Sequence, residues 1–126
     1  MNISVSHSSG VPIYQQIKDQ LQQQILSGAL PDGQLLPSIR SLAQTLQISV
    51  ITTKRAYDEL EQEGLVASVS GKGTFVSGRN AEALREARYR RLEELIKAVV
   101  AESRALGLPA SEVAELVHIL YGEESV

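Results

Sequence analysis

The sequence predicts a mainly α-helical protein with one small β-hairpin, followed by a tail of two helices. Three observations support this fold class. Apolar residues recur at helical spacing in three successive segments between residues 12 and 63. The pattern then changes to two short β-prone runs on either side of a glycine-rich turn. From residue 81 onward the spacing is helical again, with charged residues between leucines and valines.

The first helix is predicted over residues 12–27. Pro12 suits the first turn of a helix, because its missing N–H costs nothing there. Apolar residues then recur at a spacing of four, at Ile13, Ile17, Leu21 and Ile25. Glycine at position 28 ends this pattern, and the next residues have the composition of a turn.

Two more helices follow closely, with Ser38 and Ser49 as their natural N-caps. The second helix is short, and its expected buried face is Ile39, Leu42, Ala43 and Leu46. A brief turn at residues 47–48 leads to the third helix, which should run to about residue 63, before Gly64. Its apolar side is expected to consist of Thr53, Ala56, Tyr57 and Leu60, which leaves the opposite side exposed.

The segment from 65 to 77 is predicted to be a hairpin. Residues 65–69 and 74–77 are β-prone, and Ser70, Gly71, Lys72 and Gly73 form the tip between them. Helix, short helix, tight turn, helix and hairpin is the order of a winged helix-turn-helix. In such a domain the third helix fits the major groove of DNA, and a glycine-rich tip can approach the sugar-phosphate backbone closely.

The remaining residues are expected to form a dimerisation tail, so we predict a DNA-binding domain over 1–79 and an α-helical tail over 80–126. A long helix should run from residue 81 to about 106, and Ser111 is expected to cap a last helix beyond Gly107 and Pro109. Two helices bury too little area to form a core by themselves, so a second copy is expected to complete it. The predicted dimer interface is Leu92, Leu95, Ile96, Val99, Leu116, Val117 and Leu120.

Composition narrows the function classes. Cysteine is absent, and His7 and His118 have no partner at ligand spacing, so we expect no disulfide and no metal site. No catalytic pattern or phosphate-binding loop is present, which argues against an enzyme and against a cofactor. No apolar run approaches the roughly 18 residues of a membrane span. The N-terminus lacks a secretion signal, so a cytoplasmic protein without membrane association is expected.

The net charge does not decide the question of DNA binding. The chain carries 12 Lys+Arg and 15 Asp+Glu, a formal charge of −3, whereas small DNA-binding domains are often basic. The predicted DNA-binding domain is balanced, however, and residues 80–126 supply the whole acidic excess. Contact with phosphate depends on the charge of the local face rather than on the total.

Four motifs carry a family resemblance. They are PIYQQIKDQL at 12–21, GQLLPSIRSLA at 33–43, TKRAYDELEQEGLV at 53–66 and GKGTFV at 71–76. In this order and spacing they closely resemble the N-terminal domain of GntR-family transcription regulators. Many of these regulators carry a larger C-terminal domain, whereas the short tail here looks like that of the YtrA-type subfamily. The resemblance implies a homodimeric regulator of double-stranded operator DNA, often one that controls transporter genes. Repression, by blocking a promoter, is the expected outcome of binding.

Site residues follow from the resemblance position by position. Arg40 matches the family arginine at the start of the second helix. The groove-facing positions of the recognition helix are matched by Ser49, Val50, Ile51, Thr52 and Lys54. Val50 and Ile51 depart from the family, where polar or basic residues are frequent. The full set of expected DNA-binding residues is Ser38, Arg40, Ser49, Val50, Ile51, Thr52, Lys54, Arg55, Gly71, Lys72 and Gly73.

A second interpretation stays open at this point. Asp58, Glu59, Glu61 and Glu63 make the end of the third helix acidic, as a winged-helix module that binds a partner protein would be. A contiguous positive surface around Arg40 and Lys72 would instead favour DNA. The sequence identifies no small-molecule effector, and any such ligand is expected between subunits or between the tail and the DNA-binding domain.

Overall fold

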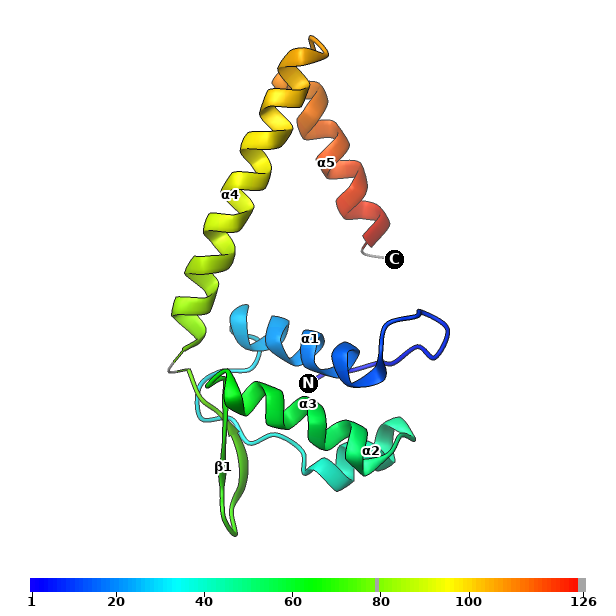
Figure 1. The fold of residues 1–126 in the computed structure, drawn as a ribbon, viewed down its shortest axis with the longest axis vertical. Coiled ribbons are helices and arrows are strands. Elements are labelled where there is room, and N and C mark those ends of the chain that lie inside the picture. The colour runs from blue at the N-terminus through cyan, green and yellow to red at the C-terminus, as the bar shows by residue number, and fades with distance from the viewer. Residues whose placement is uncertain (79, 125–126) are drawn as a thin grey trace. The chain divides into compact units, whose positions relative to one another are not determined.

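In a computed structural model that describes residues 1–78 and 80–124, the chain forms five helices and one two-stranded antiparallel sheet (Figure 1). In chain order these are α1 (Ile13–Leu26), α2 (Ile39–Leu46), α3 (Val50–Gln62), β1 (Val66–Val69), β2 (Gly73–Val76), α4 (Ala81–Ala105) and α5 (Ala110–Glu124). The type and order of these elements confirm the predicted fold class.

The chain divides into two compact units, and the division falls within α4. The first unit is Met1–Glu86 and the second begins at Ala87. The domain boundary expected at residue 79 lies outside the described residues and stays a prediction. The first turn of α4 belongs to the first unit, where Ala81 and Leu84 pack against the apolar core.

The core of the first unit forms where α3 packs against α1 and α2. Ile17 and Leu21 of α1 and Leu60 of α3 are completely buried. The faces that helical spacing predicted are therefore the faces that pack. The buried members of this core are Ile17, Leu21, Ile25, Leu30, Leu36, Leu42, Ala56, Tyr57, Leu60, Leu65, Val66 and Val76.

Tyr57 places a hydroxyl group in this core, and that hydroxyl has a hydrogen-bond partner. Its hydroxyl donates a hydrogen bond to the backbone oxygen of Pro37 at 2.8 Å. Burial raises the pKa of Tyr57 to about 12. Since Pro37 directly precedes the cap of α2, this bond fixes the entry of α2 against α3.

The helix ends are set by local side chains, as predicted. The Ser38 hydroxyl accepts a hydrogen bond from the N–H of Ser41 at 3.0 Å, and the Ser49 hydroxyl accepts one from the N–H of Thr52 at 3.0 Å. Gly64 has a φ of 75°, the left-handed conformation expected after a helix. Gln47 is also left-handed, with a φ of 57°, and this conformation turns the chain from α2 into α3.

The hairpin pairs β1 with β2 in the register Val66↔Val76 to Val69↔Gly73. An extended segment at residues 33–36, which the sequence did not predict, pairs with the other edge of β2. The N–H of Leu36 donates to the Thr74 oxygen at 2.9 Å, and the N–H of Val76 donates to the Gln34 oxygen at 2.8 Å. The hairpin is therefore anchored to the chain that leads into α2.

The N-terminal segment before α1 lies along that helix and is held by glutamine side chains. Gln20 accepts a hydrogen bond from the N–H of Ser4 and donates one to its carbonyl. Gln16 pairs with Ser6 in the same two-way manner. The two glutamines are four residues apart in the helix, and they pair with two serines that are two residues apart in the extended N-terminal segment.

The tail helices differ from the prediction in one detail. The last helix begins at Ala110, so Ser111 lies inside its first turn and is not the cap. The N–H groups of Glu112 and Val113 donate to the carbonyl of Pro109. Proline cannot continue the preceding turn, but its carbonyl is free to accept the first helical bonds. None of the helices in the part of the chain that the structure describes is long and apolar enough to cross a bilayer.

Candidate nucleic-acid interface

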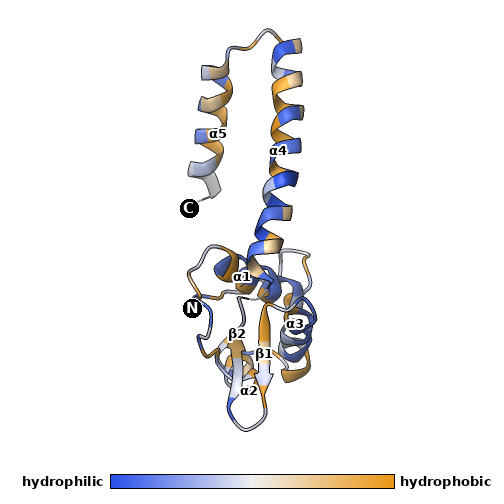
Figure 2. Ribbon diagram, turned by 90° about the vertical axis from the view of Figure 1, so that its left-hand side faces the viewer, coloured by the Kyte–Doolittle hydropathy of each residue, from blue (hydrophilic) through white to orange (hydrophobic). Residues whose placement is uncertain are grey.

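The residues expected to bind DNA lie in the first unit, on α2, on α3 and on the hairpin. This helix packs against α2 and also contacts β1 of the hairpin. In both ribbon views α2 and the hairpin extend to the same side of the first unit, away from α1 (Figures 1 and 2). The structure therefore brings the start of α2, the start of α3 and the hairpin tip onto one side.

The start of α3 exposes a short, uncharged surface. Ile51 is 82% exposed and Val50 is 43% exposed, while Thr53 in the same turn is completely buried. The Ser49 hydroxyl donates to Oγ1 of Thr52 at 2.7 Å while it accepts the N–H of that residue. These two hydroxyls hold the helix end in place, and the two apolar side chains between them point outward.

Two of the expected cations are already paired within α3. The Lys54 Nζ lies 2.6 Å from Oδ2 of Asp58, and the Arg55 Nε lies 3.2 Å from Oε2 of Glu59. The Arg55 guanidinium also stacks on the ring of Tyr14 in α1, at 3.7 Å from its centroid. This contact is a cation–π interaction between two helices, so Arg55 helps to fix α3 on α1.

The other two expected cations have no such partner. Arg40 and Lys72 are exposed, and their side chains make no hydrogen bond or ion pair with residues 1–78 and 80–124. Arg40 is the second residue of α2, directly after the serine cap. A free, exposed cation beside a helix N-terminus suits contact with an anion such as phosphate.

The hairpin tip is open to close approach. Gly71 has a φ of 76° and Gly73 a φ of 115°, and both values disfavour residues with a Cβ. A Cβ built on Gly71 would meet no atom within 4 Å. At Gly73 it would lie 3.0 Å from Cδ1 of Leu35. The glycines thus shape a turn that carries Lys72 at its end and little bulk around it.

A charged cluster that the sequence did not reveal joins α1 to α3. Lys18 Nζ lies 2.5 Å from Glu63 and 3.3 Å from Glu59. Gln22 donates to the second oxygen of Glu63 at 2.8 Å. The bond with Glu63 raises the pKa of Lys18, burial acts in the opposite direction, and Glu59 adds to the increase. Glu59 and Glu63 belong to the acidic group that would suit a partner protein, but in the structure both are paired with Lys18.

The expected dimer residues of the second unit are exposed within a single chain. No residue of α4 is buried, and Figure 2 shows apolar residues along both α4 and α5. The seven residues predicted for the interface are each between 44% and 58% exposed: Leu92, Leu95, Ile96, Val99, Leu116, Val117 and Leu120.

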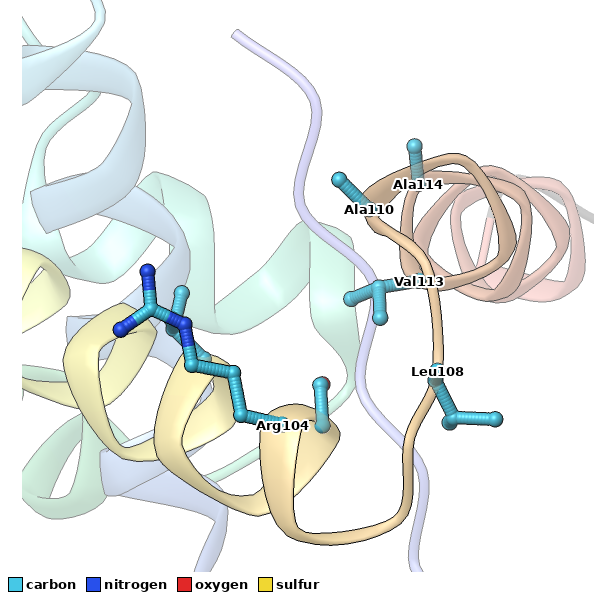
Figure 3. Close-up of a pocket in the computed structure, with 7 residues that line it drawn as sticks. Arg104, Leu108, Ala110, Val113 and Ala114 are labelled. Atoms are coloured by element: carbon cyan, nitrogen blue, oxygen red, sulfur yellow. The ribbon is translucent and has the colours of Figure 1, made fainter.

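A surface hollow of about 380 Å³ lies at the corner between α4 and α5 (Figure 3). Its walls come from the end of α4, the turn after it and the start of α5. Most of the lining is apolar, and Arg104 is its one cation among the described residues. The lining residues are Val100, Ser103, Arg104, Leu108, Ala110, Val113 and Ala114.

Comparison with known proteins gives one consistent result. Residues 13–76 match the family of bacterial regulatory proteins called gntR. The transcriptional repressor YtrA of Bacillus subtilis is 30% identical over 115 residues, which cover 91% of this chain and 88% of that protein. A solved transcriptional regulator from Oenococcus oeni has a TM-score of 0.67 and 26% identity, and the match covers 93% of this chain and 97% of that one.

A third match is a structure solved with DNA. The DNA-binding domain of AraR in complex with its operator ORX1 has a TM-score of 0.54 and 29% identity, over 61% of this chain and 96% of that one. These relatives are transcription regulators and not enzymes, in agreement with the expectation from the sequence.

Proposed function

Because this chain belongs to the GntR family of bacterial regulatory proteins and resembles YtrA over most of its length, we propose that it represses transcription by binding a palindromic operator as a homodimer. It is a DNA-binding transcription regulator. Repression is proposed because the similar protein from Bacillus subtilis is named a repressor. The YtrA-type resemblance supports transporter genes as targets.

The observation that carries the DNA contact is a pair of free cations, one at the start of α2 and one at the hairpin tip. Arg40 and Lys72 are exposed and unpaired among the described residues. The acids at the end of α3 are engaged within the chain: Glu59 and Glu63 by Lys18, Asp58 by Lys54, and Glu61 by Ser68. This arrangement favours a polyanion over a partner protein for the surface. The proposed DNA-binding residues are those named from the sequence: Ser38, Arg40, Ser49, Val50, Ile51, Thr52, Lys54, Arg55, Gly71, Lys72 and Gly73.

Different members of this set would have different tasks. Arg40 and Lys72 would bind phosphate, and backbone contacts of this kind set position rather than sequence. Lys54 would reach a base edge after leaving Asp58, since an exposed pair of this type is worth only about 0.3–0.5 kcal/mol. Arg55 would face a phosphate with its guanidinium held by Tyr14.

The homodimer is proposed through residues 80–126, with residues 1–79 as the DNA-binding domain. The support is the apolar surface that α4 and α5 leave exposed in one chain. Uncovered apolar area of this extent is typical of an interaction surface. Two-fold symmetry would bring two copies of α3 into successive major grooves, about 34 Å apart.

The proposal is tested by titrating the full chain against the palindromic sequence upstream of its own gene, with a scrambled duplex as control. Binding should exceed that of the scrambled duplex by at least about a thousandfold. Arg40→Ala should weaken binding to both duplexes and reduce the salt dependence by about one charge. Lys97→Ala, which removes an exposed cation of the tail, should change neither. Equal, weak and salt-independent binding to both duplexes would favour a protein partner instead.

A further inference from the structure

The first turn of α3 exposes two adjacent apolar side chains within the proposed DNA-binding surface. Ile51 is the most exposed large apolar residue among those described, at 82%, and Val50 lies next to it. Neither belongs to the core cluster or packs against it. Their apolar character therefore contributes little to the stability of the first unit.

The chemistry around this pair is uncharged. Ser49 and Thr52 on either side are occupied with each other, and the first turn contains no acidic residue. The first cation along the helix is Lys54, one turn later and paired with Asp58. A guanine is read by a bidentate cation, and an adenine by an amide side chain. The first turn of α3 offers neither group.

Only one group in the major groove matches such a surface. The C5-methyl of thymine is the apolar feature of the groove, and aliphatic side chains contact it. We propose that Val50 and Ile51 read thymine methyl groups in each half-site, so that the operator carries thymine where the first turn of α3 enters the groove. This inference rests on the proposed DNA-binding function and adds the base that this turn selects.

The size of the effect follows from the area of one methyl group. Burying a methyl-sized apolar group is worth a factor of roughly four in affinity at 25 °C. Each contacted thymine should therefore contribute about that factor in a half-site, and two half-sites should double the free energy. An effect of this size is measurable with one chemical change in the DNA.

The test uses the full chain and a duplex selected from a random library, in which each thymine is replaced in turn by deoxyuridine. This replacement removes the C5-methyl and leaves the hydrogen-bonding edge unchanged. Wild-type protein should lose roughly fourfold in affinity per half-site at one or two thymines. Ile51→Ala or Val50→Ala should bind the thymine duplex more weakly and should no longer distinguish thymine from uracil at that position.

Lys72→Ala is the matched control, because it removes a proposed DNA contact on another element. It should weaken binding to every duplex and retain the full penalty for deoxyuridine. Both apolar positions are exposed, so the alanine variants should melt at the wild-type temperature. A specific duplex that tolerates deoxyuridine everywhere, or an unchanged penalty in both alanine variants, would overturn the inference alone. Failure to select any specific duplex would overturn the proposed function as well.

Discussion

The two units of the chain use their apolar residues in opposite ways. In the first unit, Leu21 and Leu60 are completely buried in a core that α1, α2 and α3 form together. In the second unit, Leu95 and Leu120 are more than half exposed, and α4 has no buried residue. The difference is that one chain completes the core of the first unit, whereas the second unit leaves its apolar residues exposed, which is the surface that the proposed dimer would cover.

The largest expected effect breaks the first unit. Leu60→Ala removes a fully buried leucine, and such changes cost about 2–5 kcal/mol because a cavity remains. Urea denaturation should show this loss at every protein concentration, since the core lies within one chain. Leu106→Ala, at an exposed leucine outside both proposed surfaces, should change stability by less than about 0.5 kcal/mol.

The second prediction concerns the tail. Leu95→Ala combined with Leu120→Ala should weaken dimerisation by at least about 2 kcal/mol, or roughly thirtyfold, if these residues lie at the centre of the interface. Sedimentation equilibrium measures the dissociation constant directly. The thermal stability of this variant should depend more strongly on protein concentration than that of the wild type. An unchanged dissociation constant would exclude these two leucines from the interface.

The third prediction sharpens the account of the first core. Tyr57→Phe removes the hydrogen bond to Pro37 and should cost about 1 kcal/mol at neutral pH. The pKa of Tyr57 is about 12 in the folded protein, above its ordinary value of 10.0, so the unfolded chain loses its proton first as the pH rises. The wild type should therefore lose stability between pH 10 and 12.

The variant lacks this titration, so its deficit in unfolding free energy relative to the wild type should shrink as the pH rises above 10 and reverse before pH 12. Denaturation at pH 8, 10 and 11.5 would show it. A gap that stays constant with pH would contradict the burial of the hydroxyl. The pKa of Lys18 is also raised, so this residue too makes the protein less stable as the pH rises. Its contribution is the same in the wild type and in the variant, and it cancels in their difference.

The smallest expected effect concerns the surface of α3. Asp58→Asn removes the partner of Lys54, 2.6 Å away, and should cost only about 0.3–0.5 kcal/mol of stability. Operator affinity should rise, because Lys54 is released and a negative charge near DNA is removed. Glu94→Gln makes the same charge change beside Lys97 in the tail and should leave the affinity unchanged. Equal gains in both variants would indicate a general charge effect.

The fold of the first unit could be predicted because its determinants are local. Ser38 and Ser49 cap their helices as expected, and helical spacing identified the buried faces. The pairing of residues 33–36 with β2 could not be predicted, because it joins segments some forty positions apart and carries no β-prone pattern of its own. The glutamines at 16 and 20 had the right spacing to signal a bound segment, but glutamine on a helix is usually solvated.

The candidate site was predicted only in part. Periodicity placed Lys54 and Arg55 on the exposed side of α3, which the structure confirms. It could not show that Arg55 stacks on Tyr14 or that Lys18 engages Glu63, since both contacts join α1 to α3 across a large separation in sequence. The exposed positions could thus be predicted from the sequence. Only the structure distinguishes Lys54 and Arg55, which are paired within α3, from Arg40 and Lys72, which are not.

The most direct test of the central claim is sedimentation velocity of the full chain, over a range of concentrations, alone and with a palindromic operator duplex. We predict dimers in the free protein and one dimer on each duplex, with both half-sites occupied together. A chain that stays monomeric at every concentration and fills the two half-sites independently would contradict the claim that a second copy completes the tail.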